Sequence, residues 1–256
     1  MTPTALIFAI MASLMASLTL QSPIKTRSLL NATYPTRVLG NVMVVDTSIV
    51  QQAQGYARKY SSSAEVYNHV IRGWLFGVLM LQHNQTLSQR VDPEVHAVAA
   101  ILHDLGWDQT PDSPVVSRDR RFEVDSAIGA REFLWSRDPQ HKDWGEYRTQ
   151  LVWDSIALHT QESIYLYKEA VVSVTGSGIL SDFDGPLLGV TQAEYDAVAK
   201  EFPKGQFVGT VNQTFVWLCQ TKQSSTYDTF MQPWGEKFVE GYNASGHRIF
   251  DDITGT

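Results

Sequence analysis

Apolar side chains recur at helical spacing through most of this sequence, and no stretch alternates long enough to predict a convincing strand. An aspartate cap, a proline and an acidic residue at 92–94 begin one helix, and Gly106 suits its end. Thr191 and Glu194 have the spacing of a capping box. The sequence therefore predicts an all-α fold, with helices near residues 63–79, 92–106, 122–134, 147–159, 162–183, from 191 onward, and 209–220.

Composition limits the size of the core and the class of partner. With 256 residues, 43% of them hydrophobic, the chain can bury one sizeable core in a single domain. The net charge of −7 and the absence of a clustered basic stretch argue against nucleic-acid binding. We therefore expect a small-molecule substrate.

The N-terminus and the asparagines suggest a compartment. Residues 1–20 carry no charged side chain and their apolar stretch is short for a membrane span, so we interpret residues 1–22 as a secretory signal peptide. Cys219 is the only cysteine, which excludes an intrachain disulfide and favours a buried thiol. The sequence predicts a secreted protein, with no membrane contact in the mature form, glycosylated at Asn31, Asn84, Asn212 and Asn243.

The segment AAILHDLGWD places two ionisable residues, His103 and Asp104, at the end of an apolar helix. A cation facing both would offset the cost of burying them, provided that His69 and a later aspartate also reach it. The simpler alternative is a helix end that favours a cationic histidine beside Asp104. His96 lies seven residues before His103, about 10.5 Å along a helix, so it is not expected to share a metal.

The ordered blocks SSSAEVYNHVIR, AAILHDLGW, RFEVDSAIGAREFL, VWDSIALHT, GILSDFDG and YDAVAKEFP resemble the HD-domain superfamily of metal-dependent enzymes. They are most similar to its cyanamide hydratase-like branch, which is common in fungi. The resemblance implies a single HD-domain helical bundle over residues 61–203. Residues 23–60 would then be an N-terminal extension, and residues 204–256 a C-terminal helical extension packed on the same domain.

The resemblance also implies a mononuclear metal site. Its ligands would be His69, His103, Asp104 and the aspartate of the DFDG block, where Asp182 fits the family pattern and Asp184 is the alternate. Only two histidines, at 141 and 159, lie between the HD pair and that aspartate, which favours one metal. We expect one divalent ion, zinc, with iron or manganese as alternatives.

Other polar residues are candidates for catalysis beside Asp104. His159 ends an apolar helix and is either a proton donor or substrate holder in the pocket, or a core histidine. Glu123 and Asp125 lie two apart, so only one should point inward, and Asp125 is the one expected to orient a ligand histidine. Arg72 could pair with a buried carboxylate or form a surface contact.

These residues predict an activity. A metal-bound hydroxide would hydrate a small nitrile, converting cyanamide to urea, or would act on a related nitrile or isocyanide. An HD-type phosphohydrolase is the alternative, since Arg118, Arg120 and Arg121 could hold a phosphate. A secreted binding protein with a degenerate site is a further alternative, and a homo-oligomer is possible.

Overall fold

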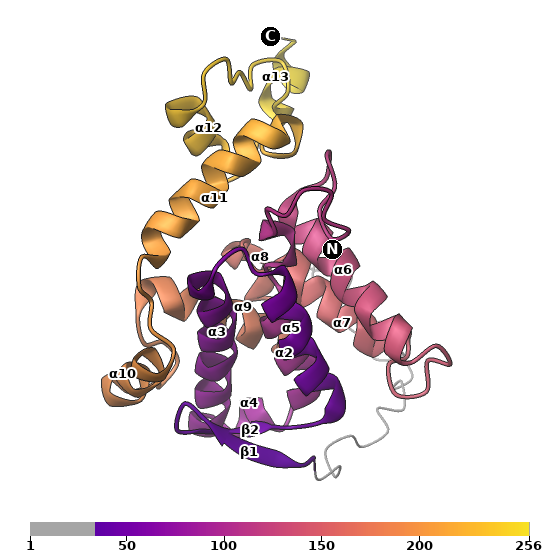
Figure 1. Cartoon of the computed structure of the whole chain (residues 1–256), viewed down its shortest axis with the longest axis vertical. Helices are drawn as coiled ribbons and strands as arrows, with labels where there is room; N and C mark the ends of the chain where they lie inside the picture. Colours follow the sequence, from indigo (N-terminus) through magenta and orange to yellow (C-terminus); the bar gives the residue numbers. More distant parts are fainter. Residues whose placement is uncertain (1–33, 256) are drawn as a thin grey trace, which may run out of the picture. The chain divides into compact units, whose positions relative to one another are not determined.

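The computed structural model describes residues 34–255, and these residues are mostly helical, as predicted (Figure 1). The predicted signal peptide and Asn31 lie outside the described residues. The elements are β1 (Thr36–Leu39), β2 (Val42–Val45), α2 (Ser48–Tyr60), α3 (Ala64–His83), α4 (Gln85–Ser88), α5 (Pro93–Leu102), η3 (Leu105–Trp107), α6 (Phe122–Arg137), α7 (Glu146–Ala157), α8 (Glu162–Tyr165), α9 (Ala170–Asp184), α10 (Gln192–Glu201), α11 (Phe207–Thr221), η4 (Gln223–Ser225), α12 (Gln232–Phe238) and α13 (Ile249–Thr254).

Helix caps explain several of these boundaries. The Ser63 hydroxyl accepts a hydrogen bond from the Val66 amide at the start of α3. Asp92 caps α5, with Pro93 in its first turn. The predicted capping box of Thr191 and Glu194 is present at α10. These caps satisfy amides that the first helical turn leaves without partners.

Three N-terminal elements were not predicted. Strands β1 and β2 form an antiparallel hairpin, and α2 follows it. Each strand has only four residues, which is too short for a readable alternation. Val44 and Val50 are nevertheless buried in the main core, so this part of the predicted extension belongs to the same core as the central helices.

The central pair of helices is α3 and α9, and glycines allow them to approach closely. A Cβ added at Gly178 on α9 would lie 2.6 Å from the Gly73 carbonyl oxygen and 2.8 Å from the Gly77 amide nitrogen on α3. Only glycine permits backbone contact at this distance. The predicted helix 162–183 is divided into α8 and α9 by a break at residues 166–169.

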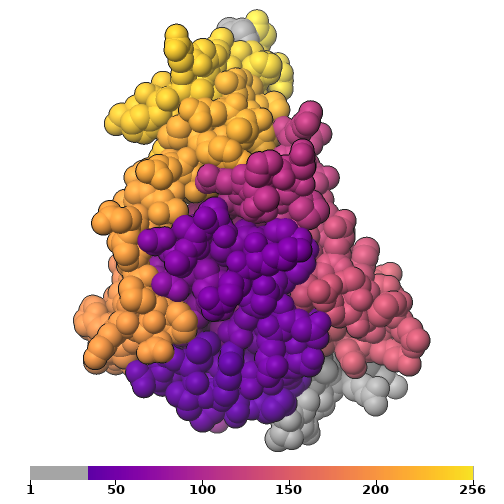
Figure 2. Space-filling view, viewed as in Figure 1, coloured from indigo at the N-terminus to yellow at the C-terminus, as the bar shows by residue number. Residues whose placement is uncertain are grey.

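The C-terminal helices lie beside this centre. Figure 2 shows the orange residues of α10 and α11 next to the indigo and purple residues of the early part of the described chain. Their contact is a second apolar cluster, in which Phe207, Val211 and Phe215 of α11 join Val66 and Phe122. Cys219 is buried there, as expected. None of the described helices has the length and apolar character needed to cross a membrane.

Candidate metal centre

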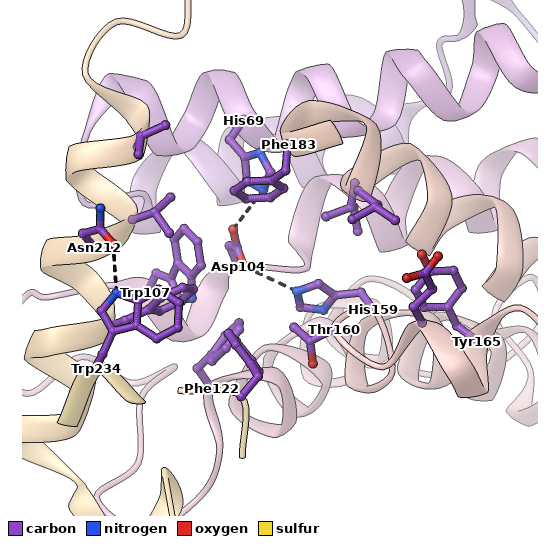
Figure 3. Close-up of a pocket in the computed structure, with 17 residues that line it drawn as sticks. His69, Asp104, Trp107, Phe122, His159, Thr160, Tyr165, Phe183, Asn212 and Trp234 are labelled. Carbon is purple, nitrogen blue, oxygen red and sulfur yellow. Dashed lines mark hydrogen bonds and ion pairs between the residues drawn. The ribbon is translucent and has the colours of Figure 1, made fainter. Parts of the chain in front are cut away.

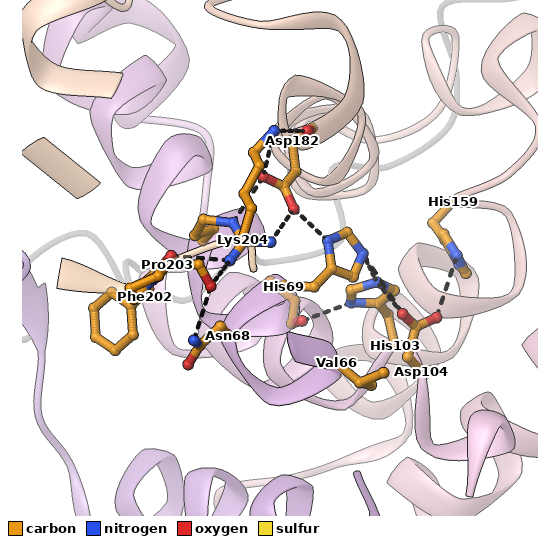
Figure 4. A network of polar contacts seen from close by, with 12 residues as sticks. Val66, Asn68, His69, His103, Asp104, His159, Asp182, Phe202, Pro203 and Lys204 are labelled. Atoms are coloured by element: carbon orange, nitrogen blue, oxygen red, sulfur yellow. Dashed lines mark hydrogen bonds and ion pairs between the residues drawn. The ribbon is translucent and has the colours of Figure 1, made fainter. Parts of the chain in front are cut away.

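Three predicted ligands meet at one buried point. His69 lies on α3, His103 at the C-cap of α5, and Asp104 just before η3. The His69 Nε2 and His103 Nε2 atoms are 3.2 Å apart, and Asp104 Oδ2 lies 3.5 Å from the first and 3.1 Å from the second. All three side chains are almost completely buried. Figure 4 shows their side chains meeting among the neighbouring polar contacts. Their ligand atoms lie within 4.8 Å of one another, which is suitable for one shared cation.

The outer nitrogen of each imidazole fixes which atom faces this point. His103 Nδ1 donates to the Ala100 carbonyl oxygen at 2.8 Å, and His69 Nδ1 lies 2.7 Å from Asp182 Oδ2. Both Nε2 atoms therefore direct lone pairs inward. Burial lowers the pKa of His69 despite the nearby carboxylates, which favours its neutral form. Two lone pairs 3.2 Å apart repel each other, and a cation between them would remove that repulsion.

Asp104 also lies in a position that a cation would stabilise. Both of its carboxylate oxygens are buried, and neither has a hydrogen-bond partner among the described residues. Burial disfavours the charged carboxylate, and the Nε2 lone pairs that face it from His69 and His103 do not offset that cost. A buried carboxylate without a partner is costly, and two imidazole nitrogens with a carboxylate form a donor set that suits zinc, iron or manganese. The residues present therefore fit a divalent metal.

The structure places Asp182 behind His69 rather than within this group. Its carboxylate contacts His69 Nδ1 and accepts two hydrogen bonds from Arg72, from Nε at 2.8 Å and from Nη2 at 2.7 Å. Burial opposes ionisation, yet these hydrogen bonds hold the pKa of Asp182 well below its ordinary value. The predicted pairing of Arg72 with a buried carboxylate is present. Asp182 as a direct ligand stays a prediction, and the alternate, Asp184, is exposed.

Beside the three ligand atoms lies a pocket with a cavity volume of about 460 Å³ (Figure 3). His159 faces it, with Nε2 3.9 Å from Asp104 Oδ1 and Nδ1 donating to the Ile156 carbonyl oxygen. Burial lowers the pKa of His159 to about 4. Its neighbour Thr160 also lines the pocket and donates to Glu123 Oε1 at 2.8 Å. The pocket therefore adjoins both the ligand group and a fixed imidazole.

The structure does not place Asp125 where it was expected. Its carboxylate accepts hydrogen bonds from the Ser117 amide, Arg120 Nε and Lys222 Nζ, so it ties α6 to the preceding loop and to the end of α11. None of its hydrogen-bond partners in residues 34–255 is a ligand histidine. Glu123, and not Asp125, is the acidic residue that reaches the pocket through Thr160. Both acids are buried, although only one was expected to point inward. They contact different neighbours of α6.

His96 lies outside the ligand group, as predicted. Its Nε2 donates to the Trp74 carbonyl oxygen at 3.3 Å, and its Nδ1 accepts from the Thr175 hydroxyl at 2.9 Å. It therefore links α5 to α3 and α9 as a buried, neutral histidine. Burial lowers its pKa to about 4.

Sequence reasoning missed the C-terminal wall of the pocket. Phe215, Phe230 and Trp234 line it. Asn212, one of the predicted glycosylation sites, also lines it and accepts a hydrogen bond from Trp234 Nε1. The density of aromatic residues after position 206 was the only signal that could have indicated a binding surface.

Comparison with protein-family models finds an HD domain at residues 66–182. This range begins on α3 just before His69 and ends at Asp182, so it includes all four predicted ligands. The chain therefore contains an HD domain, and its buried histidine and aspartate group could hold a metal. Comparison with curated proteins gave no match. The cyanamide hydratase branch thus remains a prediction.

Proposed function

We propose that this protein is a metal-dependent enzyme that adds water to a neutral nitrile, with cyanamide to urea as the simplest case. The metal would be held by His69 Nε2, His103 Nε2 and the Asp104 carboxylate. Asp182 either orients His69 from behind or, as predicted from the sequence, is a fourth ligand. When bound there, a divalent ion would activate water for attack at neutral pH.

The observation that carries this proposal is the charge of the pocket. Among the described residues that line it, none is a lysine or an arginine, and two are acidic, Asp104 and Glu162. A phosphate ester carries negative charge and requires cationic side chains near the metal. A neutral substrate has no such requirement.

Two of the three arginines on which the phosphate alternative rests have carboxylate partners, and the third, Arg118, is exposed and does not line the pocket. Arg120 pairs with Asp125 and Arg121 with Glu123. Arg72 is completely buried against Asp182 and the carbonyl oxygens of residues 202 and 203. The charge of Arg72, Arg120 and Arg121 is therefore committed to carboxylates outside the pocket lining.

Two side chains can handle the nucleophile and the substrate. His159 presents a lone pair on Nε2 toward the pocket, because its Nδ1 proton is donated to Ile156. It can accept a hydrogen bond from water and orient the oxygen toward the substrate carbon. Thr160 donates its proton to Glu123, so its oxygen can accept a hydrogen bond from a substrate N–H group.

The test is product formation from cyanamide and a series of neutral nitriles, with metal-loaded protein and after treatment with a strong chelator. We expect urea or the corresponding amide from at least one nitrile, and loss of product after chelation. His159→Ala should lower kcat by about 10²-fold or more. His141 is exposed, so His141→Asn serves as the control and should leave turnover unchanged.

The contrary results are equally clear. Release of inorganic phosphate from p-nitrophenyl phosphate, with no product from any nitrile, would favour the HD-type phosphohydrolase. Metal binding without turnover of either substrate class would favour the binding-protein alternative.

A further inference from the structure

The pocket is much larger than cyanamide requires. Its volume of about 460 Å³ lies in the range of cavities that hold drug-sized ligands, roughly 300–1,000 Å³. Cyanamide is only a few times the size of a water molecule, whose share of liquid volume is about 30 Å³. A substrate that fills this space needs a body in addition to its reacting group.

One wall of the pocket is aromatic. Phe215 on α11 is at its centre, with its ring centroid 5.5 Å from Trp107, 5.3 Å from Phe230 and 5.0 Å from Trp234, all in edge-to-face arrangements. Phe122 contacts the same group from the start of α6. Figure 3 shows Phe122, Trp107 and Trp234 on one side of the open space, with Asp104 and His159 facing it. This wall suits a flat aromatic ring.

Apolar side chains also line the pocket where it is accessible to solvent. Phe183 is 49% exposed and Val208 is 70% exposed, and both line the pocket. The Phe183 ring lies 5.3 Å from the His69 ring and 5.5 Å from the Phe207 ring, so it borders the ligand group directly. Exposed apolar residues beside a pocket are typical of a surface that receives an apolar ligand.

The aromatic wall is built largely by residues outside the matched domain. Phe215, Phe230 and Trp234 follow residue 182, where the HD match ends. The end of α11 is held to α6 by the buried pair of Lys222 Nζ and Asp125 Oδ2, which are 2.7 Å apart. The C-terminal helices are therefore anchored beside the metal group and can determine which substrate fits.

We propose that the substrate is an aryl nitrile, a neutral aromatic ring carrying the C≡N group, which this protein hydrates to the aryl amide. This inference rests on the function proposed above. The ring occupies the space beside Phe122, Phe215 and Trp234, and the nitrile points toward Asp104 and His159. Water adds across the triple bond: one C–O and one N–H bond form while one carbon–nitrogen π bond and one O–H bond break, which gives an imidic acid. Its remaining O–H proton then moves to nitrogen, the second carbon–nitrogen π bond is replaced by the C=O π bond, and the amide results.

Binding can be measured separately from turnover. Isothermal titration calorimetry would give the Kd of benzonitrile and of acetonitrile, which lacks the ring, on both metal-loaded and chelator-treated protein. We expect benzonitrile to bind at least tenfold more tightly than acetonitrile in both preparations, because the aromatic wall does not depend on the metal. Equal affinities would overturn the proposal.

A substitution that fills the pocket tests the location. Val211 lines the cavity and Val216 lies on the same helix outside the lining, so Val211→Phe and Val216→Phe make the same change at two places. We expect Val211→Phe to weaken benzonitrile binding at least tenfold and Val216→Phe to leave it within twofold. Circular dichroism would establish that both variants are folded. Equal effects of the two variants would contradict the location.

Turnover distinguishes this inference from the function on which it rests. Chelator-sensitive benzamide formation, faster than urea formation from cyanamide, would support both. Chelator-sensitive urea formation without benzonitrile binding would support nitrile hydration and overturn the aryl substrate. Selective benzonitrile binding without amide from any nitrile would support the aromatic ligand class and overturn nitrile hydration.

Discussion

Asp104 is the residue whose surroundings most require a cation. It is buried, negatively charged and without a hydrogen-bond partner on either oxygen among the described residues. The adjacent Nε2 atoms of His69 and His103 present lone pairs to Asp104 rather than N–H groups, because the proton of each ring lies on Nδ1 and is donated to another residue. One divalent ion would satisfy all three groups together.

Asp182 provides a test of how the ligand histidine is held. If it acts through His69 Nδ1, Asp182→Asn should retain one equivalent of metal but bind it about 10–100-fold more weakly, since the partner that orients the imidazole is altered. The absorption spectrum of the Co²⁺-substituted protein should then be unchanged in position and intensity. A clear change in that spectrum would instead show that Asp182 is a direct ligand.

His96 should make stability depend on pH. His96 is buried beside Trp74 and Thr175, and this burial lowers its pKa from 6.5 to about 4. No charged side chain in residues 34–255 contributes to this change in pKa. The unfolded chain therefore binds more protons between these values, and the stabilising contribution is complete above pH 6.5 and lost as pH falls toward 4. The cost at pH 4 is about 3 kcal/mol.

Urea denaturation between pH 7 and pH 4.5, in the presence of chelator, measures this contribution. His96→Gln retains the chance to bond both neighbours but does not titrate. The free energy of unfolding of the wild type should therefore fall more steeply with decreasing pH than that of the variant. Parallel pH profiles would contradict this role for His96.

At the scale of the elements, the site depends on the close contact of α3 and α9. His69 and Arg72 lie on α3 and Asp182 on α9, so their hydrogen bonds require the approach that Gly178 permits. A methyl group at this position would contact backbone atoms, which cannot move aside as a flexible side chain can. The geometry of the ligand group is therefore linked to helix packing.

Gly178→Ala should lower the free energy of unfolding by about 3 kcal/mol, because overpacking forces the helices apart, and it should also weaken metal binding. Gly55→Ala is the matched control. It lies on α2, is exposed and has no atom within 4 Å of the added Cβ, so the better helix propensity of alanine should stabilise the protein by about 0.5–1 kcal/mol. Similar effects of both substitutions in chemical denaturation would contradict the packing account.

At the scale of the whole molecule, the sequence was sufficient for the longer helices from α3 to α11 and for part of the site. The caps at 92–94 and 191–194 are local signals, and the structure contains both. His69 and His103 were predicted to lie near each other because the order of their motifs along the chain resembles that of HD-domain enzymes. Local patterns cannot show which partner a buried acid will choose, so Asp125 was expected near a ligand but pairs with Lys222.

The remaining differences also arise from long-range contacts. The hairpin at 36–45 is stabilised by packing on the helices rather than by its own pattern. The aromatic residues of the C-terminus would have the same spacing in the sequence whether they filled a core or lined a cavity. Only their position next to Asp104 and His159 shows that they line the pocket.

The central claim is that His69, His103 and Asp104 hold one metal ion, and the most direct test is the metal content of the purified protein, measured by mass spectrometry with inductively coupled plasma. We expect about one equivalent per chain in the wild type and in His96→Ala, although the latter should have a lower Tm because it loses buried hydrogen bonds. His103→Ala and Asp104→Ala should each contain almost none while remaining folded. A full equivalent of tightly bound metal in either of those variants would contradict the account.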